Sequence, residues 1–259
     1  MNNRAAVWGQ TALRQIRTLP AFAKYCLCAR NPAHSAPMIS ALEKMRSSPL
    51  LVRVVPFLLF VVLTVFQGRF GETSQYWVYL AKIIVGAWLL WLIRSQVPEM
   101  RWSFSWEAVV VGIAVFGMWV GLDPFYRKFG QTGPGWNPFA SFPTNEALAW
   151  VMVAGRILGS TLVVPPLEEV FYRSFVYRYI IRQDFQGVPL NEFRLVPFLV
   201  SALIFGLAHF EWLAGILCAL AYHWLILHKN RLGDAILAHA ITNFLLGLWV
   251  VWKRDWHFW

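Results

Sequence analysis

The segment ALAWVMVAGRILGSTLVVPPLEEVFYRSF, Ala147 to Phe175, decides how this chain folds. Its first part ends at Val164 and is a nearly unbroken apolar run, long enough to cross a lipid bilayer as a helix. The two prolines that follow lack backbone N–H donors, which predicts an interruption of the helix. After them, an amphipathic helix is predicted from Leu167 to about Arg182, and two adjacent glutamates lie in its first turn.

The rest of the chain has the same apolar character. Only 14% of the 259 residues are charged, whereas soluble domains contain about 25% charged residues. Helices satisfy their own backbone hydrogen bonds in lipid, so the composition predicts an all-α polytopic membrane protein. We expect about eight membrane helices in one bundle. Their predicted ranges are Leu50–Gly68, Tyr76–Ile93, Ala108–Leu122, Ala147–Val164, Leu167–Arg182, Leu195–Phe210, Trp212–Leu227 and Gly233–Trp252.

A basic arm, residues 1–48, precedes this membrane domain, which we place at residues 49–259. The arm contains seven Lys and Arg residues and a single acid, Glu43. Positive charge beside a first membrane span is typical of a cytoplasmic segment held on anionic lipid. Nucleic-acid binding is the alternative, but aromatic residues are weakly interleaved with the charges and the rest of the chain is membrane-embedded. We therefore expect the arm to lie on lipid and to bind no nucleic acid, and we leave open whether it also recruits a protein partner.

Three further features of the sequence are a Gly/Pro-rich segment, a group of tryptophans near the C-terminus and the cysteines. The Gly/Pro-rich segment Gly130 to Pro143 is predicted to be a surface loop. The tryptophans near the C-terminus predict an aromatic belt at the membrane interface and no ligand cage; they are Trp249, Trp252, Trp256 and Trp259. The three cysteines, Cys26, Cys28 and Cys218, form no metal-binding or disulfide pattern.

Three groups of polar residues interrupt the apolar second half of the chain. An ionisable side chain at membrane depth costs about 2.5–3.5 kcal/mol on insertion scales, so a functional site or a transport pathway is the default explanation. The groups are EEVFYR with Glu168, Glu169 and Arg173, FGLAH with Phe205 and His209, and HAITN with His239 and Asn243.

The spacing of the first group gives its two acids different surroundings. Glu169 and Arg173 are four residues apart, in the favourable order for an ion pair on a helix. Glu168 points about 100° away around the helix and has no partner on it. Two neighbouring carboxyl groups in different environments can take different roles in acid–base chemistry. The alternative is that both acids only stabilise the start of a helix.

A lone His or Asn in a membrane helix is often a structural contact between helices. Together, however, the three groups supply what peptide hydrolysis requires. Glu168 and His209 would orient and deprotonate a water molecule. His239 and Asn243 would donate hydrogen bonds to the oxyanion of the tetrahedral intermediate.

These motifs, in this order and on membrane helices, resemble the CPBP family of intramembrane endopeptidases. That family includes CAAX prenyl proteases and bacterial Abi-type self-immunity proteins. The resemblance covers about residues 147–250 and matches the family's motif positions, which are Glu168, Glu169, Arg173, Phe205, His209, His239 and Asn243. It implies an eight-helix protein of a bacterial cell membrane that cleaves a peptide bond near the membrane face. The implied substrate is a peptide, a lipidated CAAX-type protein or another membrane-associated protein.

The resemblance leaves the cofactor and the function class open. The family is also described as metalloproteases, and a zinc ion held by Glu168, His209 and His239 would keep a fourth position for water. No His-Glu-x-x-His motif occurs, so we expect a metal-free mechanism. An ion- or proton-coupled transporter would also hold buried acids and histidines, although paired repeats would be expected in it. A non-catalytic membrane scaffold with the same fold is the third possibility.

Overall fold

A computed structural model describes residues 41–130 and 135–259. Within these ranges every regular element is a helix and no strand occurs, which confirms the predicted all-α class. Most of the predicted basic arm lies outside the described residues, as do Cys26 and Cys28. The last part of the arm, Ala41–Ser47, forms the short helix α1.

Seven apolar helices build the described part of the membrane domain. Five are long and apolar enough to cross a bilayer, and two are shorter. The long ones are α3 (Ser74–Ile93), the helix Trp106–Phe125 that begins with α4 (Trp106–Leu122), the continuous helix Glu146–Ile181, α10 (Trp212–Lys229) and α11 (Leu232–Lys253); the shorter ones are α2 (Leu51–Val65) and α9 (Leu195–Leu207). Their composition indicates an integral membrane protein.

The predicted count of eight is not confirmed, because two predicted helices are parts of one. The 36-residue helix Glu146–Ile181 consists of α6 (Glu146–Leu162), α7 (Val164–Glu169), a π-helical segment (Val170–Tyr177) and α8 (Arg178–Ile181). The predicted interruption is reduced to a turn at Val163. Both prolines lie in the first turn of α7, where backbone N–H groups have no partner within the helix in any case.

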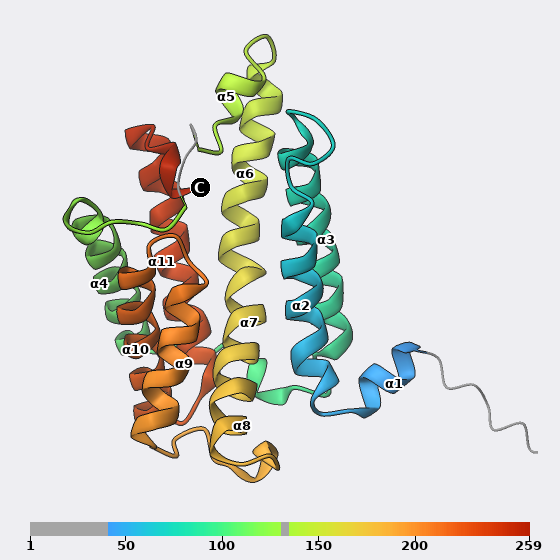
Figure 1. The fold of residues 1–259 in the computed structure, drawn as a ribbon, viewed down its shortest axis with the longest axis vertical. Coiled ribbons are helices and arrows are strands. Elements are labelled where there is room, and N and C mark those ends of the chain that lie inside the picture. Colours follow the sequence, from blue (N-terminus) through green and yellow to red (C-terminus); the bar gives the residue numbers. More distant parts are fainter. Residues whose placement is uncertain (1–40, 131–134) are drawn as a thin grey trace, which may run out of the picture. The chain divides into compact units, whose positions relative to one another are not determined.

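The long helix lies between two groups of helices (Figure 1). On one side α2 packs against α3, and on the other side α4, α9, α10 and α11 pack together. Close approach of α4 and α11 depends on Gly112, where an added Cβ would come within 2.7 Å of the carbonyl oxygen of Ala238. Small residues permit such backbone contacts between membrane helices.

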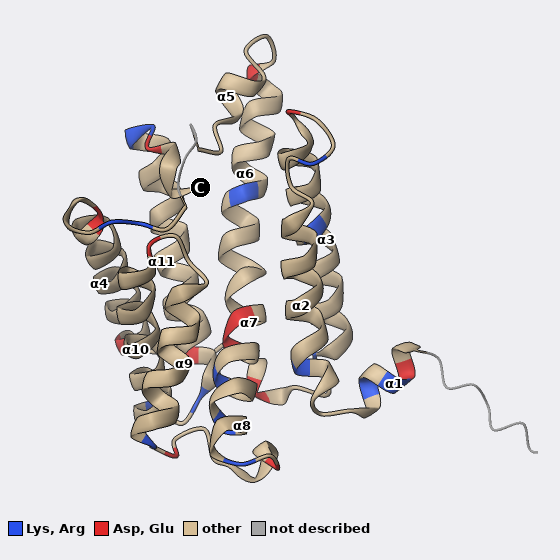
Figure 2. Cartoon of the chain, viewed as in Figure 1, with Lys and Arg blue, Asp and Glu red and all other residues tan. Residues whose placement is uncertain are grey.

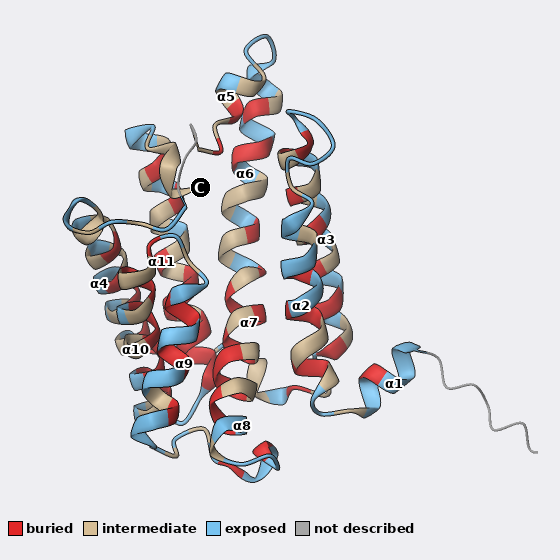
Figure 3. Cartoon of the chain, in the orientation of Figure 1, coloured by how far each residue is buried: buried red, intermediate tan, exposed pale blue. Residues whose placement is uncertain are grey.

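Burial follows this arrangement (Figure 3). Buried residues gather in the half of the bundle that contains α7, α9 and α10, whereas the outward faces of the helices carry exposed apolar side chains. Trp106 and Val110 on α4, for example, are 73% and 63% exposed. Apolar surface on this scale, on helices of membrane-spanning length, is suited to contact with lipid.

The segment predicted as a surface loop is only partly one. Pro138–Ser141 form the short helix α5, and Trp136 is buried against Tyr76 and Tyr79. A tryptophan buries a large apolar area, so it anchors the segment to α3.

A buried ionic cluster ties the long helix to the start of α2. Glu99, between α3 and α4, accepts hydrogen bonds from Arg53 Nε at 3.1 Å, Ser174 Oγ at 2.6 Å and Arg178 Nη2 at 3.2 Å. Burial alone would raise the pKa of Glu99, but the charge of Arg53 and the Ser174 hydroxyl outweigh it and lower the pKa. The folded state therefore holds this carboxylate ionised.

Replacement of Glu99 by Gln is expected to lower the free energy of unfolding by about 3–5 kcal/mol, because it leaves two buried arginines without their shared acid. The pH dependence has a definite sign. Because the pKa of Glu99 is lower in the folded than in the unfolded protein, its ionisation stabilises the fold at pH values above the unfolded-state pKa. This stabilisation is lost as the pH falls through the folded-state pKa of Glu99. Thermal unfolding in detergent at several pH values measures both effects. Glu72→Gln, at an exposed position before α3, is the control; equal melting temperatures for the two variants would contradict the prediction.

Candidate active site

The two predicted acids lie in the second half of the long helix, where α7 passes into the π-helical segment. π-Helical turns are rare and occur frequently at functional sites. The side chain of Glu169 is completely buried, whereas that of Glu168 is 15% exposed. Two adjacent carboxyl groups thus have different surroundings, as the sequence predicts.

Glu169 connects two of the predicted motifs. Its Oε1 atom is 3.1 Å from Arg173 Nη1, which confirms the predicted ion pair, and 3.0 Å from His239 Nδ1. The Arg173 guanidinium in turn lies over the ring of Phe205, 4.4 Å from its centre. Glu169 and Arg173 are buried behind the cavity and do not line it. They support the residues in front of them.

His239 on α11 lies against both glutamates. A carboxylate only accepts hydrogen bonds, so the contact with Glu169 places a proton on Nδ1 and leaves Nε2 facing Glu168, whose Oε2 atom is 3.9 Å away. The imidazole ring stacks on Tyr222, which donates a hydrogen bond to Thr242 at 2.7 Å. The hydrogen bond to Glu169 and the stacking on Tyr222 therefore fix the orientation of His239.

His209 follows the end of α9, which stops at Leu207, three residues earlier than predicted. The backbone N–H groups of Ala208 and His209 bond to carbonyls three residues back, which tightens the turn and ends the helix. His209 Nδ1 donates to the carbonyl of Phe205 at 2.8 Å, so Nε2 is the ring nitrogen that can accept a hydrogen bond from water or substrate. No hydrogen bond joins His209 to Glu168, so only a shared water lets the two act together.

Asn243 lies one turn beyond His239 on α11. Its Nδ2 atom donates to the backbone carbonyl of Ser160 on α6 at 2.8 Å. That contact fixes the amide and leaves its second N–H and its oxygen for other partners.

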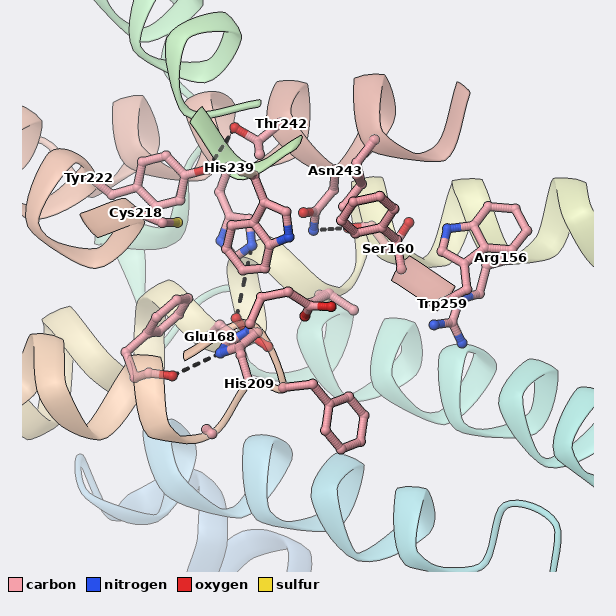
Figure 4. Close-up of a pocket in the computed structure, with 18 of the residues that line it drawn as sticks. Arg156, Ser160, Glu168, His209, Cys218, Tyr222, His239, Thr242, Asn243 and Trp259 are labelled. Atoms are coloured by element: carbon pink, nitrogen blue, oxygen red, sulfur yellow. Dashed lines mark hydrogen bonds and ion pairs between the residues drawn. The ribbon is translucent and has the colours of Figure 1, made fainter. Parts of the chain in front are cut away.

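A cavity of about 280 Å³ brings these residues together. Figure 4 shows Glu168, His209, His239 and Asn243 around it, contributed by the long helix, the turn before α10, and α11. Phe205 also lines it. All the predicted catalytic residues thus lie at one site, and Glu168 Oε2 is buried there without a hydrogen-bond partner.

Several cavity residues were not predicted from the sequence. They are Trp119, Arg156, Glu211, Tyr222, Thr242, His257 and Trp259. Glu211 is buried at the start of α10, and desolvation raises its pKa. An acid two residues after His209, at the border of an apolar helix, was the available signal. Of the predicted tryptophan belt, Trp252 is exposed, whereas Trp259 packs over Arg156.

The alternative zinc ligands fit poorly as they are placed. Glu168 Oε2 and His239 Nε2 are 3.9 Å apart, close enough to share an ion with bonds of about 2.0–2.2 Å after a small adjustment. His209 does not complete the set, and among residues 41–130 and 135–259 no three His, Cys, Asp or Glu side chains are grouped to hold a metal. The arrangement provides two zinc ligands where a catalytic site needs three.

Comparison with known proteins addresses the same region. Residues 150–245 match the family model described as type II CAAX prenyl endopeptidase Rce1-like. This range contains the three motifs and runs from the long helix into α11. No curated protein and no solved structure matches the chain. The family consists of proteases, so the match supports a peptidase. The resemblance indicated by the motifs is thereby confirmed: residues 150–245 are similar to the Rce1-like type II CAAX prenyl endopeptidases.

Proposed function

We propose that this protein is an intramembrane endopeptidase that hydrolyses a peptide bond close to the membrane face. One observation carries the proposal: a single cavity holds an unbonded carboxylate oxygen of Glu168, the free Nε2 of His209, the Nε2 of His239 and the amide of Asn243. This set supplies a base, a second group to orient water, and donors for an oxyanion.

In the proposed reaction, Glu168 removes a proton from a water molecule that His209 Nε2 orients. The resulting hydroxide attacks the carbonyl carbon of the scissile bond, and the carbonyl oxygen becomes an oxyanion. Glu168 then returns the proton to the leaving nitrogen as the C–N bond breaks. The same carboxyl group serves as base and then as acid.

The free amide N–H of Asn243 donates to the oxyanion. His239 can donate from Nε2 only when both ring nitrogens carry protons, since Nδ1 already donates to Glu169. Glu169 is then the group that balances the imidazolium charge. Loss of one oxyanion donor typically costs about 2.7–4 kcal/mol of transition-state stabilisation.

The proposed substrate is a membrane-associated protein, with a lipidated CAAX-type C-terminus as the first candidate. The family match names that substrate class. Much of the cavity wall is apolar, including Trp119, Val164, Phe205, Leu246 and Phe258. Such a wall suits an apolar side chain or a lipid group beside the scissile bond.

Cleavage of synthetic peptides by the full chain in lipid vesicles tests this function. The set contains a prenylated CAAX peptide, its unprenylated form and a membrane-anchored peptide without the motif, and mass spectrometry identifies both products. We expect one bond to be cut in at least one peptide. If all three stay intact while the vesicles show a protein-dependent proton or ion flux, the transporter hypothesis takes precedence. If neither cleavage nor flux is seen, a scaffold is the better description.

Chelation tests the metal-free mechanism. Because the cavity supplies two zinc ligands rather than three, we expect the cleavage rate to be unchanged after dialysis against a strong chelator. Metal analysis of the active protein is expected to find well below one zinc per chain. Loss of activity on chelation, with recovery on adding zinc, would establish a metalloprotease instead.

A further inference from the structure

Arg156 is an arginine of the cavity that the proposed reaction does not use. It lies on α6, and Arg156, Ser160, Val164 and Glu168 follow one another at intervals of four residues along the cavity wall. In Figure 2 it is the basic band on α6, since no other Lys or Arg occurs between Glu146 and Leu162. Figure 4 shows it beyond Asn243 and Ser160, at the end of the site away from Tyr222.

Aromatic rings surround its guanidinium. The guanidinium carbon is 4.6 Å from the ring centre of Tyr79, 5.0 Å from that of Trp136 and 5.8 Å from that of Trp259. Trp136 in turn packs against Tyr79 and Trp259. Cation–π contacts hold the planar group in place without using its N–H donors.

No acid neutralises this charge. The 13 Asp and Glu residues of the chain all lie in the described ranges, and none of them forms an ion pair with Arg156. Its guanidinium donates no hydrogen bond to any described residue. The buried arginines elsewhere differ, since Arg53 and Arg178 share Glu99, and Arg173 binds Glu169. Arg156 is thus a fixed cation with free donors at the edge of the proposed active site.

We propose that Arg156 binds a carboxylate of the peptide substrate, and that Tyr79, Trp136 and Trp259 hold the guanidinium ready for it. This inference rests on the proposed peptidase function and deepens it. A guanidinium matches a carboxylate through two parallel hydrogen bonds. Exclusion of water by the apolar wall strengthens the attraction. The cage therefore makes Arg156 a specificity-determining residue.

The position of Arg156 along the helix limits where that carboxylate lies. Twelve residues separate it from Glu168, or about 18 Å at 1.5 Å per residue. An extended peptide covers this distance in about five residues, and in fewer if the two side chains reach toward each other. The carboxylate is therefore a few residues from the scissile bond. Its source is either the C-terminus of the substrate or an Asp or Glu side chain.

Three versions of one cleavable peptide distinguish these sources. The first ends in a free acid, the second in an amide, and the third in an amide after a final Asp. With the wild-type protein, kcat/KM for the free acid is expected to exceed that for the plain amide by about 10- to 100-fold, the range for a hydrogen bond between charged partners. High activity on the Asp amide would identify a side-chain carboxylate as a second ligand, whereas low activity would restrict the site to the C-terminus.

Arg156→Gln is expected to remove the preference by reducing cleavage of the free acid to the level of the amide, mainly through KM. Arg156→Lys keeps the positive charge but cannot donate two parallel hydrogen bonds to a carboxylate, so it is expected to retain part of the preference for the free acid. Arg94→Gln is the matched control, because Arg94 also lies over a tryptophan ring, Trp91, but is exposed outside the cavity. Equal cleavage of all three peptides by the wild type, or an equal loss on all three in Arg156→Gln, would overturn the carboxylate site while leaving the peptidase intact.

A binding measurement keeps the test independent of turnover. Fluorescent forms of the three peptides are titrated into Glu168→Gln in detergent and followed by anisotropy. Tighter binding of the free acid or of the Asp amide than of the plain amide, lost in Glu168→Gln/Arg156→Gln, supports the site. Equal affinities for all three peptides reject it even if no cleavable peptide is found.

Discussion

Glu168→Gln is expected to reduce kcat/KM for peptide cleavage by about 10²–10⁴-fold, the contribution usual for a general base. Glutamine has the shape of glutamate but cannot accept the proton of the attacking water. The exchange weakens the 3.9 Å contact of Glu168 Oε2 with His239 Nε2, but it breaks no hydrogen bond, because that atom accepts none. The melting temperature of the variant is therefore expected to stay close to that of the wild type.

Single-turnover cleavage in vesicles measures this effect at the chemical step. Glu146→Gln is the matched control, since Glu146 begins the same long helix but lies outside the catalytic cavity. Wild-type cleavage by Glu168→Gln would remove Glu168 as the base. Equal losses in both variants would show that the assay reports damage to the helix and not the chemistry.

Glu169→Gln is expected to act differently, by damaging stability as well as activity. Its buried carboxylate serves Arg173 and His239 together, and loss of one partner from a buried ion pair typically costs about 3–5 kcal/mol. His239 would also lose the acceptor that orients its ring. We therefore expect a clear drop in melting temperature together with a loss of cleavage.

A double variant separates the two consequences. In Glu169→Gln/Arg173→Met the uncompensated arginine is gone, so part of the lost stability is expected to return. Activity is not expected to return, because His239 still lacks its carboxylate. A double variant with both properties restored would show that Glu169 acts only through Arg173. Unfolding and cleavage measured on the same protein preparations decide the question.

Local spacing was sufficient to predict part of the site. The Glu169–Arg173 ion pair joins residues of one helix, so periodicity alone predicts it. The apolar segments likewise give the helices of the bundle within a few residues. The continuity of the long helix was not predictable in this way, because prolines that interrupt a helix interior are tolerated in the first turn of a following one.

Contacts between segments that are distant in the sequence could not be predicted from local spacing. His239 meets Glu169 across 70 residues, so the sequence could assign it a hydrogen-bonding role but not its position between two glutamates. The cage of Arg156 draws on Tyr79, Trp136 and Trp259, which belong to three different segments. A tryptophan near the C-terminus predicts an interfacial belt, and only the packing of the helices shows that Trp259 lies over Arg156.

The length of the Glu146–Ile181 helix has a consequence for where the protein meets water. At 1.5 Å per residue its 36 residues extend about 54 Å, whereas a bilayer including its headgroups is about 40–45 Å thick. Membrane helices rarely tilt beyond about 40°, and at that tilt the rod still rises about 41 Å, well beyond the roughly 30 Å of hydrocarbon. One or both of its ends must therefore leave the acyl chains. For the proposed lipidated substrate, the same helix can accordingly contact a hydrated polypeptide tail and a lipid-embedded anchor.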